Sequence, residues 1–234
     1  MSTVSRTPEP IKQYFDRIAP HYDRINTLLS FGLHHVWRRR TITAAEIFRG
    51  ARVLDVCSGT GDLAVRAGRT AGSSGMIVAY DFSRTMLVHA LKKQNRPGKV
   101  HLVCGDAERI ALRDESFDVV LIGFGLRNLL NMDRGIAEIY RVLRHGGRCV
   151  CLEFSRPKNL WFRLLYDVYS FYVIPWLGGA VSGCREAYQY LPASIRRFPL
   201  PDRIVAMMQQ AGFVNAIWRP VAYGIAALYR GEKL

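Results

Sequence analysis

Three aspartates and two glycines are spaced so that they could hold a small charged molecule. Asp55 ends the apolar run "RVLDV" and precedes the loop "CSGTGD", which contains Gly59 and Gly61. Asp81 ends the next apolar run, "MIVAYD", and Asp106 follows a third, "VHLVC". Ordinary turn or cap roles would explain any one aspartate. They explain poorly why all three follow successive strand-like runs, since ligands of open α/β sheets bind at the carboxyl ends of strands.

The charge around the loop indicates which ligand it takes. A dinucleotide fingerprint needs G-x-G-x-x-G, but Cys57 stands at the first glycine position and Ala64 lies downstream. Carboxylates repel a pyrophosphate, and Asp62 adds another beside the loop. S-adenosylmethionine fits better, because it carries a sulfonium and an ammonium and no phosphate. We expect Asp81 to accept hydrogen bonds from the ribose hydroxyls, Asp106 from the adenine amino group, and the amide of Ala107 to meet a ring nitrogen.

The elements that must position these residues follow from hydrophobic periodicity. Apolar residues at three-and-four spacing predict helices within residues 9–48, and short apolar runs alternating with helical stretches follow from Arg52. Runs without polar alternation are typical of strands buried on both faces, so the pattern predicts a parallel, doubly wound sheet. The expected strands are "RVLDV", "MIVAYD", "VHLVC", "FDVVLIGF" and "GRCVCLEF", with helices at about 61–71, 83–95 and 133–144. Ser83 is a candidate N-cap and Gly146 a candidate C-terminal stop.

The alternation of short apolar runs with helical stretches ends after Phe154. The stretch "NLWFRLLYDVYSFYVIPWLGGAV" is dense in aromatics, but Arg163, Asp167 and Pro175 argue against a transmembrane span, so we expect an amphipathic helical insertion. A helix, "PDRIVAMMQQAG", then leads into two strand-like runs that predict a terminal antiparallel hairpin. The length of 234 residues fits one domain over 1–234. Its expected parts are a helical cap (9–48), a cofactor-binding core (51–155), an insertion (156–198) and a closing helix with strands (199–234).

Composition limits the partners. The formal charge of +14 implies attraction for an anionic surface, either nucleic acid or acidic lipid. A membrane face is favoured, because arginines gather at residues 38–40 and flank or follow the apolar insertion as Arg185, Arg196, Arg197 and Arg203. The polar start of the chain lacks a secretory pattern, which predicts a cytoplasmic protein. The five cysteines contain no C-x-x-C pair, so core thiols are expected rather than disulfides, and no metal.

Longer motifs carry a family resemblance. The stretches "FDRIAPHYDRINTLLSFGLHHVWRR", "VLDVCSGTGDLA", "GDAERIALRDESFDVVLIGFGLRN" and "EIYRVLRHGGRCVCLEFSRP" resemble the menaquinone/ubiquinone biosynthesis C-methyltransferase family, over about Tyr14 to Lys233. The resemblance implies a class I S-adenosylmethionine-dependent methyltransferase, Rossmann-like, with a seven-stranded, mostly parallel sheet. It implies methyl-donor contacts at Thr60, Asp81, Asp106 and Ala107. Many members have a serine where this chain has Gly123, which leaves a backbone contact there.

The resemblance also implies the reaction, methyl transfer to a ring carbon of a reduced prenylated quinone. We favour demethylmenaquinol, with a ubiquinol precursor as the alternative. Arg127 and Asn128 follow the fourth strand, where they could orient or polarise the quinol oxygens. His21, Tyr22 and Asp23 are candidate proton acceptors, although His21 could equally be an exposed turn residue. Tyr22 shares a helix face with Asn26, and the pair could instead anchor that helix.

The insertion at 159–181 then has two open interpretations. Its aromatics could line a passage for the prenyl tail or lie in the bilayer interface, with flanking arginines on lipid headgroups, which would make the enzyme a peripheral membrane protein. Alternatively they could be buried in the core or in a homodimer.

Rival functions are a nucleic-acid methyltransferase, a nicotinamide-dependent oxidoreductase and a non-catalytic binding domain. Enzymes that methylate base amino groups are expected to carry "N/D-P-P-Y/F" after the fourth strand, where this chain has "GFGLRN". We therefore expect no nucleic-acid partner, and the carboxylate-rich loop predicts binding of S-adenosylmethionine rather than NADH.

Overall fold

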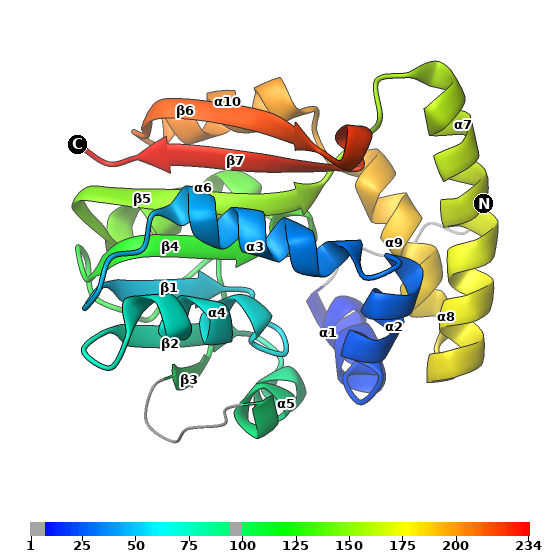
Figure 1. Ribbon diagram of the computed structural model, residues 1–234, viewed down its shortest axis with the longest axis horizontal. Helices are drawn as coiled ribbons and strands as arrows, with labels where there is room; N and C mark the ends of the chain where they lie inside the picture. The colour runs from blue at the N-terminus through cyan, green and yellow to red at the C-terminus, as the bar shows by residue number, and fades with distance from the viewer. Residues whose placement is uncertain (1–7, 94–99) are drawn as a thin grey trace.

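The apolar runs of the sequence form one mixed sheet (Figure 1). The computed structural model describes residues 8–93 and 100–234. The sheet has seven strands in the order β3-β2-β1-β4-β5-β7-β6, of which only β7 runs antiparallel to its neighbours. The strands are β1 (Arg52–Val56), β2 (Met76–Asp81), β3 (Val100–Cys104), β4 (Phe117–Gly123), β5 (Leu143–Phe154), β6 (Val214–Val221) and β7 (Ala226–Glu232). The predicted parallel sheet and terminal hairpin are confirmed.

The strand order reverses beside β1. β2 pairs with β1 on one side and β4 pairs with it on the other, both in parallel, so the chain crosses over at this point. Asp55 of β1 stands opposite Ala79 of β2 and Leu121 of β4. Such a reversal leaves a crevice at the carboxyl ends of the strands, which is where open α/β sheets bind ligands.

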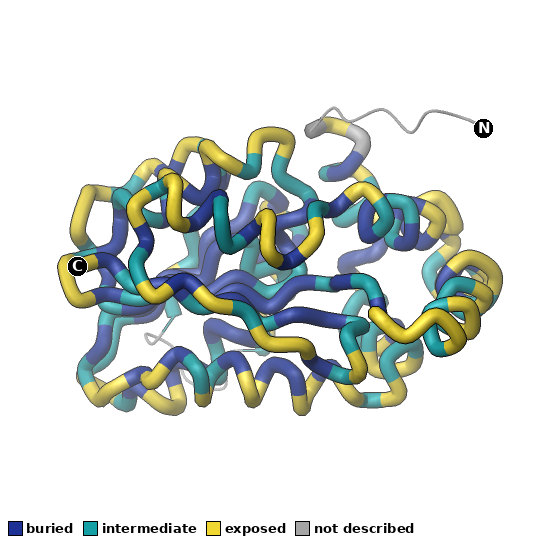
Figure 2. Tube along the Cα trace, turned by 90° about the horizontal axis from the view of Figure 1, so that it is seen from above, coloured by how far each residue is buried: buried dark blue, intermediate teal, exposed yellow. Residues whose placement is uncertain are grey.

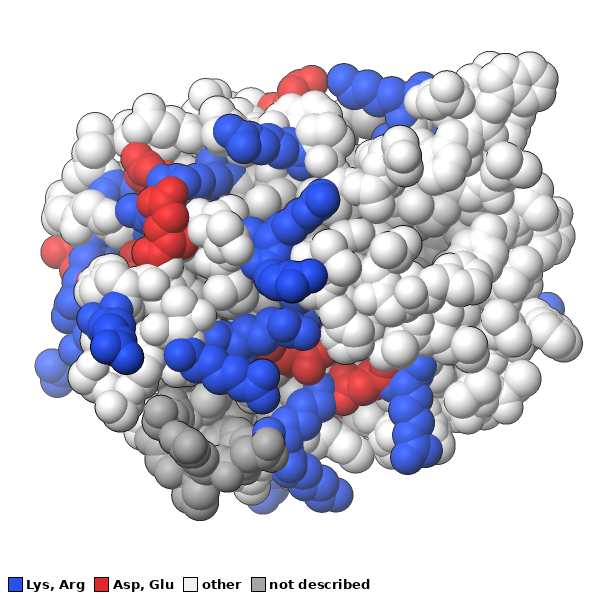
Figure 3. All heavy atoms as spheres, in the orientation of Figure 1, with Lys and Arg blue, Asp and Glu red and all other residues white. Residues whose placement is uncertain are grey.

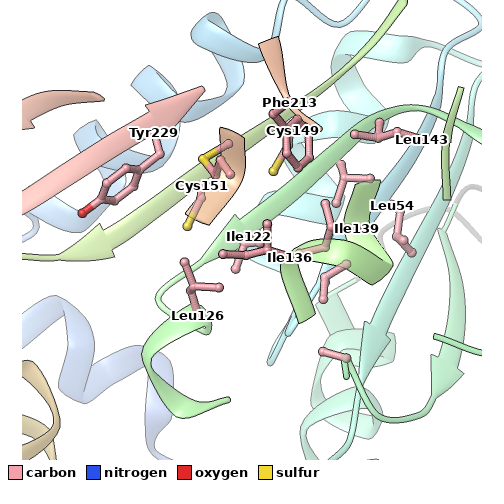
Figure 4. Close-up of a cluster of buried hydrophobic side chains, with 14 of the residues drawn as sticks. Leu54, Ile122, Leu126, Ile136, Ile139, Leu143, Cys149, Cys151, Phe213 and Tyr229 are labelled. Carbon is pink, nitrogen blue, oxygen red and sulfur yellow. The ribbon is translucent and has the colours of Figure 1, made fainter. Parts of the chain in front are cut away.

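Helices cover both faces of the sheet. Buried side chains of α3 (Leu33–Ala45), α4 (Asp62–Ala71) and α5 (Arg84–Lys93) pack on one face. Those of α6 (Met132–Val142) and α10 (Pro201–Gln210) pack on the other, in the cluster drawn in Figure 4. Figure 2 shows the buried strands between these two layers. This double cover explains why the parallel strands read as continuous apolar runs.

A separate group of helices stands over the carboxyl ends of the parallel strands (Figure 1). The chain begins there with α1 (Pro8–Ile18) and α2 (Tyr22–Leu29), and returns to it with α9 (Arg185–Arg197). These helices share a small core with α5 and with the insertion, formed by residues such as Ile18, Ile25, Met86 and Tyr188. The predicted N-terminal helices are confirmed, but of these only α1 and α2 stand over the edge where the acidic residues gather, because α3 covers a face of the sheet.

The insertion is one long helical segment at the edge of the molecule (Figure 1). It consists of α7 (Leu160–Val168), the π-helical stretch η2 (Tyr169–Val173) and α8 (Ile174–Ser182). Pro175 lacks an amide hydrogen, and the wider π turn before it lets the helix continue. By length and composition the described segment Leu160–Ser182 is apolar enough to cross a membrane. One side nevertheless packs on the protein, because Ser170, Ile174 and Gly178 are buried.

Two predicted helix boundaries have different outcomes. Ser83 caps α5, since its Oγ accepts a hydrogen bond from the Met86 amide at 3.0 Å. Gly146 is wrong as a helix stop, because α6 ends at Val142 and β5 starts at once. Gly146 has φ 76° inside β5, where the pairing with β4 shifts register, so the glycine serves a bulge instead. Short 3₁₀ turns complete the fold at η1 (Leu126–Asn128) and η3 (Ala222–Gly224).

The cysteines differ in their exposure. All five cysteines are free, and Cys149, Cys151 and Cys184 are buried, as expected for core thiols. Cys104 is exposed and Cys57 is half-buried. The end of the predicted helix 83–95 and the first seven residues of the chain lie outside the described residues.

Candidate active site

A cavity of about 230 Å³ opens at the carboxyl ends of β1, β2 and β4. We call it the strand-end cavity. Its ionisable lining consists of three carboxylic acids, two tyrosines and one cysteine, and no lysine, arginine or histidine is among its described lining residues. The lining residues are Ile11, Phe15, Tyr22, Cys57, Gly59, Tyr80, Asp81, Phe82, Met86, Gly105, Asp106, Ala107, Glu108, Gly123, Phe124, Gly125, Asn128, Leu129 and Leu130. An acidic wall without a cation suits a positively charged ligand and repels a pyrophosphate.

The glycine loop is held open by backbone conformation. Gly59 has φ 55° and Gly61 has φ 77°, both in the left-handed region that glycine adopts without steric cost. A Cβ on Gly61 would lie 3.0 Å from the Cβ of Ala90, so α5 also approaches closely here. Cys57 adopts φ 54°, which a side chain rarely does. The missing first glycine of the fingerprint therefore does not prevent the turn.

Asp81 joins the loop to the second strand. Its Oδ2 accepts the Gly59 amide at 2.8 Å, and its Oδ1 accepts the Ser83 amide at 2.8 Å. The residue is buried, and burial raises the pKa of its carboxyl to about 6 although these amides oppose the shift. The carboxylate thus lies on the cavity wall in a fixed orientation, as expected for a group that accepts ribose hydroxyls.

The next acidic corner lies on the wall of the same cavity. Asp106 and Ala107 both line the strand-end cavity, together with Glu108. Asp106 is exposed, and its Oδ1 accepts the Glu108 amide at 2.8 Å. Gly123 lines the cavity as well, and a Cβ there would lie 2.8 Å from Leu63 Cδ1. Leu63 therefore has to move before a serine can occupy this position.

Three predicted contacts lie elsewhere. Asp55, Thr60 and Gly61 do not line the strand-end cavity. Asp55 is buried behind the loop, where its Oδ2 accepts the Ala64 amide at 2.9 Å and its Oδ1 has no partner among the described residues. Burial raises the pKa of its carboxyl to about 8. Asp55 thus holds the start of α4 and does not line the strand-end cavity.

Thr60 belongs to a polar cluster between the loop and the cap. Its Oγ1 donates to Asp23 Oδ1 at 2.7 Å and accepts from Lys93 Nζ at 2.8 Å. Lys93 also pairs with Asp23 Oδ2 at 2.5 Å and with Asp62 Oδ1 at 2.9 Å. Thr60 is only 2% exposed, so its hydroxyl is used to fasten α2 and α5 to the loop.

A second and larger cavity, of about 330 Å³, lies between the cap, the insertion and the sheet. We call it the aromatic cavity. Its described lining includes Arg38, Arg127 and His34 but no carboxylic acid, so its charge is opposite to that of the strand-end cavity. Nearly half of its lining residues are aromatic: Tyr14, Phe15, Tyr22, Phe31, Trp37, Phe124, Phe154, Phe162, Tyr166, Tyr169, Tyr188 and Tyr190. Such a lining suits a flat ring with a long apolar substituent.

Tyr22, Phe15 and Phe124 line both cavities, so the two adjoin at these rings. Burial raises the pKa of the Tyr22 hydroxyl, against the opposing charges of Arg38 and Arg127. A neutral phenol donates a hydrogen bond but is a poor proton acceptor near neutral pH. Its predicted proximity to Asn26 is confirmed, since the Asn26 side chain hydrogen-bonds to it.

Arg127 is fixed at the edge of the aromatic cavity. Its Nη1 lies 2.9 Å from Glu153 Oε1, its Nε donates to Ser194 Oγ at 3.3 Å, and its guanidinium stacks over the Phe154 ring at 5.2 Å. Glu153 is fully buried, and it also accepts the backbone amide of Arg127. No described residue hydrogen-bonds to Nη2 of Arg127, which leaves donors for a ligand.

The other predicted reaction residues separate into two groups. Asn128 lines the strand-end cavity, and its Oδ1 accepts from the Tyr190 hydroxyl at 3.2 Å. His21 and Asp23 line neither cavity. His21 precedes α2 without a side-chain cap, and Asp23 is held by Lys93 and Thr60. Their role as proton acceptors stays a prediction, with neither side chain on a cavity wall.

Sequence reasoning missed Glu153 and His34. Glu153 stands within the apolar run "CVCLEF", and a charged residue inside a buried strand signals a buried partner. His34 has no such signal. The described residues hold no group of three or more His, Cys, Asp or Glu side chains arranged for a metal.

Comparison with known proteins agrees with this geometry. The family model described as the ubiE/COQ5 methyltransferase family matches residues 2–233. A demethylmenaquinone methyltransferase from Anoxybacillus flavithermus is 40% identical over 227 residues, which cover 96% of each chain. A ubiquinone/menaquinone biosynthesis C-methyltransferase from Haemophilus ducreyi is 39% identical over 226 residues, covering 95% of this chain and 87% of that one.

Solved structures support the fold. The cyclase SpnF superposes with a TM-score of 0.70 at 19% identity, covering 97% of each chain. A SAM-dependent methyltransferase from Thermotoga maritima superposes with a TM-score of 0.67 at 18% identity, covering 96% of this chain and 100% of that one. At these identities the likeness concerns the class I, Rossmann-like fold alone. The family match and the close relatives carry the assignment: the chain belongs to the ubiE/COQ5 methyltransferase family of S-adenosylmethionine-dependent enzymes.

Proposed function

We propose that this enzyme transfers the methyl group of S-adenosylmethionine to a ring carbon of demethylmenaquinol. The observation that carries the proposal is the pair of adjoining cavities with opposite lining. The strand-end cavity has carboxylates and no cation, and the aromatic cavity has two arginines and no carboxylate. A cationic donor and an electron-rich, prenylated acceptor fit these two environments, and they meet at Tyr22, Phe15 and Phe124.

The residues present fit the donor. Asp81 and Asp106 offer carboxylate acceptors, and Ala107 offers its backbone amide, all on the strand-end cavity. Gly59 and Gly123 contribute backbone without side chains in the way. When bound, S-adenosylmethionine supplies an activated methyl group on a positively charged sulfur.

The acceptor side needs little dedicated chemistry. One quinol hydroxyl loses its proton to solvent, and the ring carbon forms a bond to the methyl carbon as the methyl–sulfur bond breaks and neutral S-adenosylhomocysteine leaves. The ring C–H proton is then lost and a proton returns to the oxygen, which restores the aromatic quinol. We infer that Arg127 stabilises the developing phenolate through the donors that Glu153 leaves unused. Tyr22 donates a hydrogen bond and separates the two ligands. Holding carbon and methyl in line can contribute about 7–11 kcal/mol in favourable cases.

The test is direct methyl transfer. Purified protein, labelled S-adenosylmethionine and vesicles containing reduced demethylmenaquinone should yield labelled menaquinone, with bulk RNA in a parallel reaction as a control. Labelled RNA together with unmodified quinol would overturn the proposal. Because the relatives include enzymes named for both quinone classes, a demethylated ubiquinol precursor forms the second arm, and a higher kcat/KM there would move the acceptor to the benzoquinone class.

We further propose that the enzyme is cytoplasmic and docks peripherally on a membrane through the insertion. Exposed apolar side chains cover its outer side: Leu160, Trp161, Leu164, Leu165, Val168, Phe171, Tyr172, Trp176 and Val181. Phe162, Leu165, Tyr166 and Tyr169 of the same segment line the aromatic cavity, so the outer face is continuous with the acceptor site. Figure 3 shows this end of the molecule mostly free of charged side chains, with more Lys and Arg than Asp and Glu beside it. A prenylated acceptor could thus enter from the bilayer.

Some predicted headgroup contacts are already used within the protein. Arg196 pairs with Asp167 of the insertion and lies over the Phe171 ring at 5.6 Å. Arg185, Arg197 and Arg203 are exposed and available to lipid. The pairing also explains how Asp167 is tolerated in an apolar helix, since its charge has a partner.

Vesicle flotation tests the docking. Trp161→Ser with Trp176→Ser should reduce binding to vesicles containing anionic lipid, while Phe48→Ser, an exposed apolar residue beyond the far end of α3, should not. A homodimer is the competing occupant of this face. Equal flotation of all variants, together with a concentration-dependent dimer that the tryptophan substitutions abolish, would contradict the docking. It would show that a second copy of the chain covers this face.

A further inference from the structure

A second arginine borders the aromatic cavity. Arg38 lies on α3 and is 6% exposed, although its neighbours Arg39 and Arg40 are exposed. The sequence places all three in one basic cluster, yet the fold turns Arg38 inward to line the cavity. A buried guanidinium beside an otherwise apolar lining needs a reason, because its desolvation is costly.

Arg38 is fixed in place but only partly used. Its Nη1 pairs with Asp62 Oδ2 at 2.9 Å and also contacts Nδ1 of His34. None of the residues in the described part of the chain hydrogen-bonds to its Nε or Nη2. Asp62 pairs in turn with Lys93, so the carboxylate that holds Arg38 belongs to the cluster on the glycine loop. The arginine is therefore oriented with donors to spare.

His34 is neutral and helps to orient this arginine. Burial and the adjacent Arg38 charge lower the pKa of His34 to about 3. Its Nδ1 faces the guanidinium and must be the acceptor, so its Nε2 carries the hydrogen and donates to Thr27 Oγ1 at 3.1 Å. The Thr27 hydroxyl then donates to the Asp23 carbonyl at 2.9 Å. This chain of contacts holds the Nη1 end of Arg38 in place.

Arg38 and Arg127 act on the same part of the cavity. The positive charges of both lower the pKa of the Tyr22 hydroxyl, against the effect of burial, and the effect of Arg38 is the larger. They come from different elements, α3 and η1, and each has its own carboxylate partner, the half-buried Asp62 and the fully buried Glu153. Both guanidinium groups and Tyr22 thus line the same cavity.

We propose that Arg38 is a second acceptor-binding residue, which holds the quinol oxygen that Arg127 does not hold. The inference rests on the proposed function. A quinol has two oxygens on opposite sides of its ring, and in an aromatic cavity an unpaired buried oxygen carries a free-energy penalty. Two fixed guanidinium groups with unused donors satisfy both oxygens. They also fix the ring orientation, and so determine which ring carbon faces the methyl donor.

Ligands that each lack one oxygen test this assignment. The probes are a short-chain prenylated naphthalenediol and its two mono-hydroxy analogues, with binding followed through tryptophan fluorescence, since Trp37 lines the cavity. Wild type should bind the diol about tenfold or more tightly than either analogue, as expected for hydrogen bonds to a charged group. Arg38→Met should lose the preference against one analogue, and Arg127→Met the preference against the other.

Two further variants separate binding from folding. Arg38→Lys keeps a positive charge beside Asp62 but loses the planar fork, and should show an intermediate preference. Arg39→Met, exposed on the same helix, should keep both preferences. Affinity for S-adenosylmethionine, measured by calorimetry, should stay within about threefold in every variant, because Arg38 does not line the strand-end cavity.

The outcomes are distinct. If Arg38→Met and Arg38→Lys both discriminate between the probes as wild type does, Arg38 only anchors α3 and the inference fails. If Arg38→Met does not fold, the preference of Arg38→Lys decides, and a wild-type preference there overturns the assignment. If wild type methylates no prenylated quinol, the proposed function fails, and that result does not depend on any Arg38 variant.

Discussion

The carboxylate of Asp81 accepts the backbone amide of Gly59 at 2.8 Å, which ties the end of β2 to the turn of the glycine loop. The contact joins two segments 22 residues apart and places an acid on the wall of the strand-end cavity. The acid is nearly buried, so its protonation state affects both the loop and the ligand.

Acidic pH should weaken binding of S-adenosylmethionine through Asp81. Burial raises the pKa of this carboxyl to about 6, so the group is ionised above that pH and protonated below it. The ionised form accepts hydrogen bonds from hydroxyls and from Gly59, and the protonated form loses part of this capacity. Calorimetry between pH 5 and pH 8 should give a dissociation constant that rises steadily below about pH 6.

Asp81→Asn should bind the donor at least about tenfold more weakly at pH 8, since a charged acceptor is replaced by a neutral one. Its affinity should also depend less on pH. Asp133→Asn, on the exposed first turn of α6, is the matched control and should behave as wild type. An unchanged affinity in Asp81→Asn would show that the carboxylate serves only the loop.

Asp55 should make the protein less stable as the pH rises. Its pKa is about 8 in the folded state because of burial, against an ordinary value of 3.8 in the unfolded chain. Between these values the folded state binds more protons, so the free energy of unfolding falls with rising pH, by at most about 1.4 kcal/mol per pH unit. Asp55→Asn should flatten this slope in urea titrations at pH 5 and pH 8. An equal slope in both proteins would contradict the buried, protonated state.

The sheet could be predicted from the sequence, but only part of the candidate site could. The alternation of apolar runs with helical stretches was enough to predict a parallel sheet, because strands covered on both faces read as continuous apolar runs. The order of the strands came only from the structure. The location of Asp81 and Asp106 at the carboxyl-end edge of the sheet could also be predicted, because each follows or ends a strand. Both lie on the strand-end cavity.

The direction in which each side chain points could not be predicted from the sequence. Asp55 ends a strand just as Asp81 does, yet it lies behind the loop on the Ala64 amide. Arg38 and Arg39 are adjacent in one basic run, but a helix turns neighbours about 100° apart, so one lines a cavity and the other faces solvent. Glu153 and Arg127 are 26 residues apart, and only the pairing of β4 with β5 brings their segments together.

Substitutions should separate the structural role of Arg127 from its chemical role. Arg127→Met leaves the fully buried Glu153 without its partner, and should destabilise the fold by about 3–5 kcal/mol. The double variant Arg127→Met with Glu153→Gln removes both charges and should recover much of this stability. Neither protein should regain methyl transfer, with kcat lowered about 100-fold or more by loss of the cation beside the developing phenolate.

Measurement combines thermal unfolding with single-turnover kinetics at saturating donor. Affinity for S-adenosylmethionine serves as the internal control and should be retained, since Arg127 lines only the aromatic cavity. Recovery of wild-type kcat in the stable double variant would assign Arg127 to folding alone.

Thr60 should matter more for the acceptor than for the donor. The family resemblance implies a donor contact, whereas its hydroxyl is enclosed between Asp23 and Lys93 and lies off the strand-end cavity. Thr60→Val keeps the shape and removes the hydroxyl, so it should cost about 1 kcal/mol of stability and change donor affinity by less than about threefold. Thr60→Ser keeps the hydroxyl and is the matched control.

The effect on the acceptor follows from the position of Asp23 in α2. The residue before it, Tyr22, borders both cavities, so loosening the contact between Thr60 and Asp23 frees the helix that places Tyr22. The KM for the quinol should therefore rise in Thr60→Val while the dissociation constant of S-adenosylmethionine stays nearly constant. The reverse pattern, a weakened donor with an unchanged acceptor KM, would restore Thr60 to the donor site and show that the loop rearranges when the donor binds.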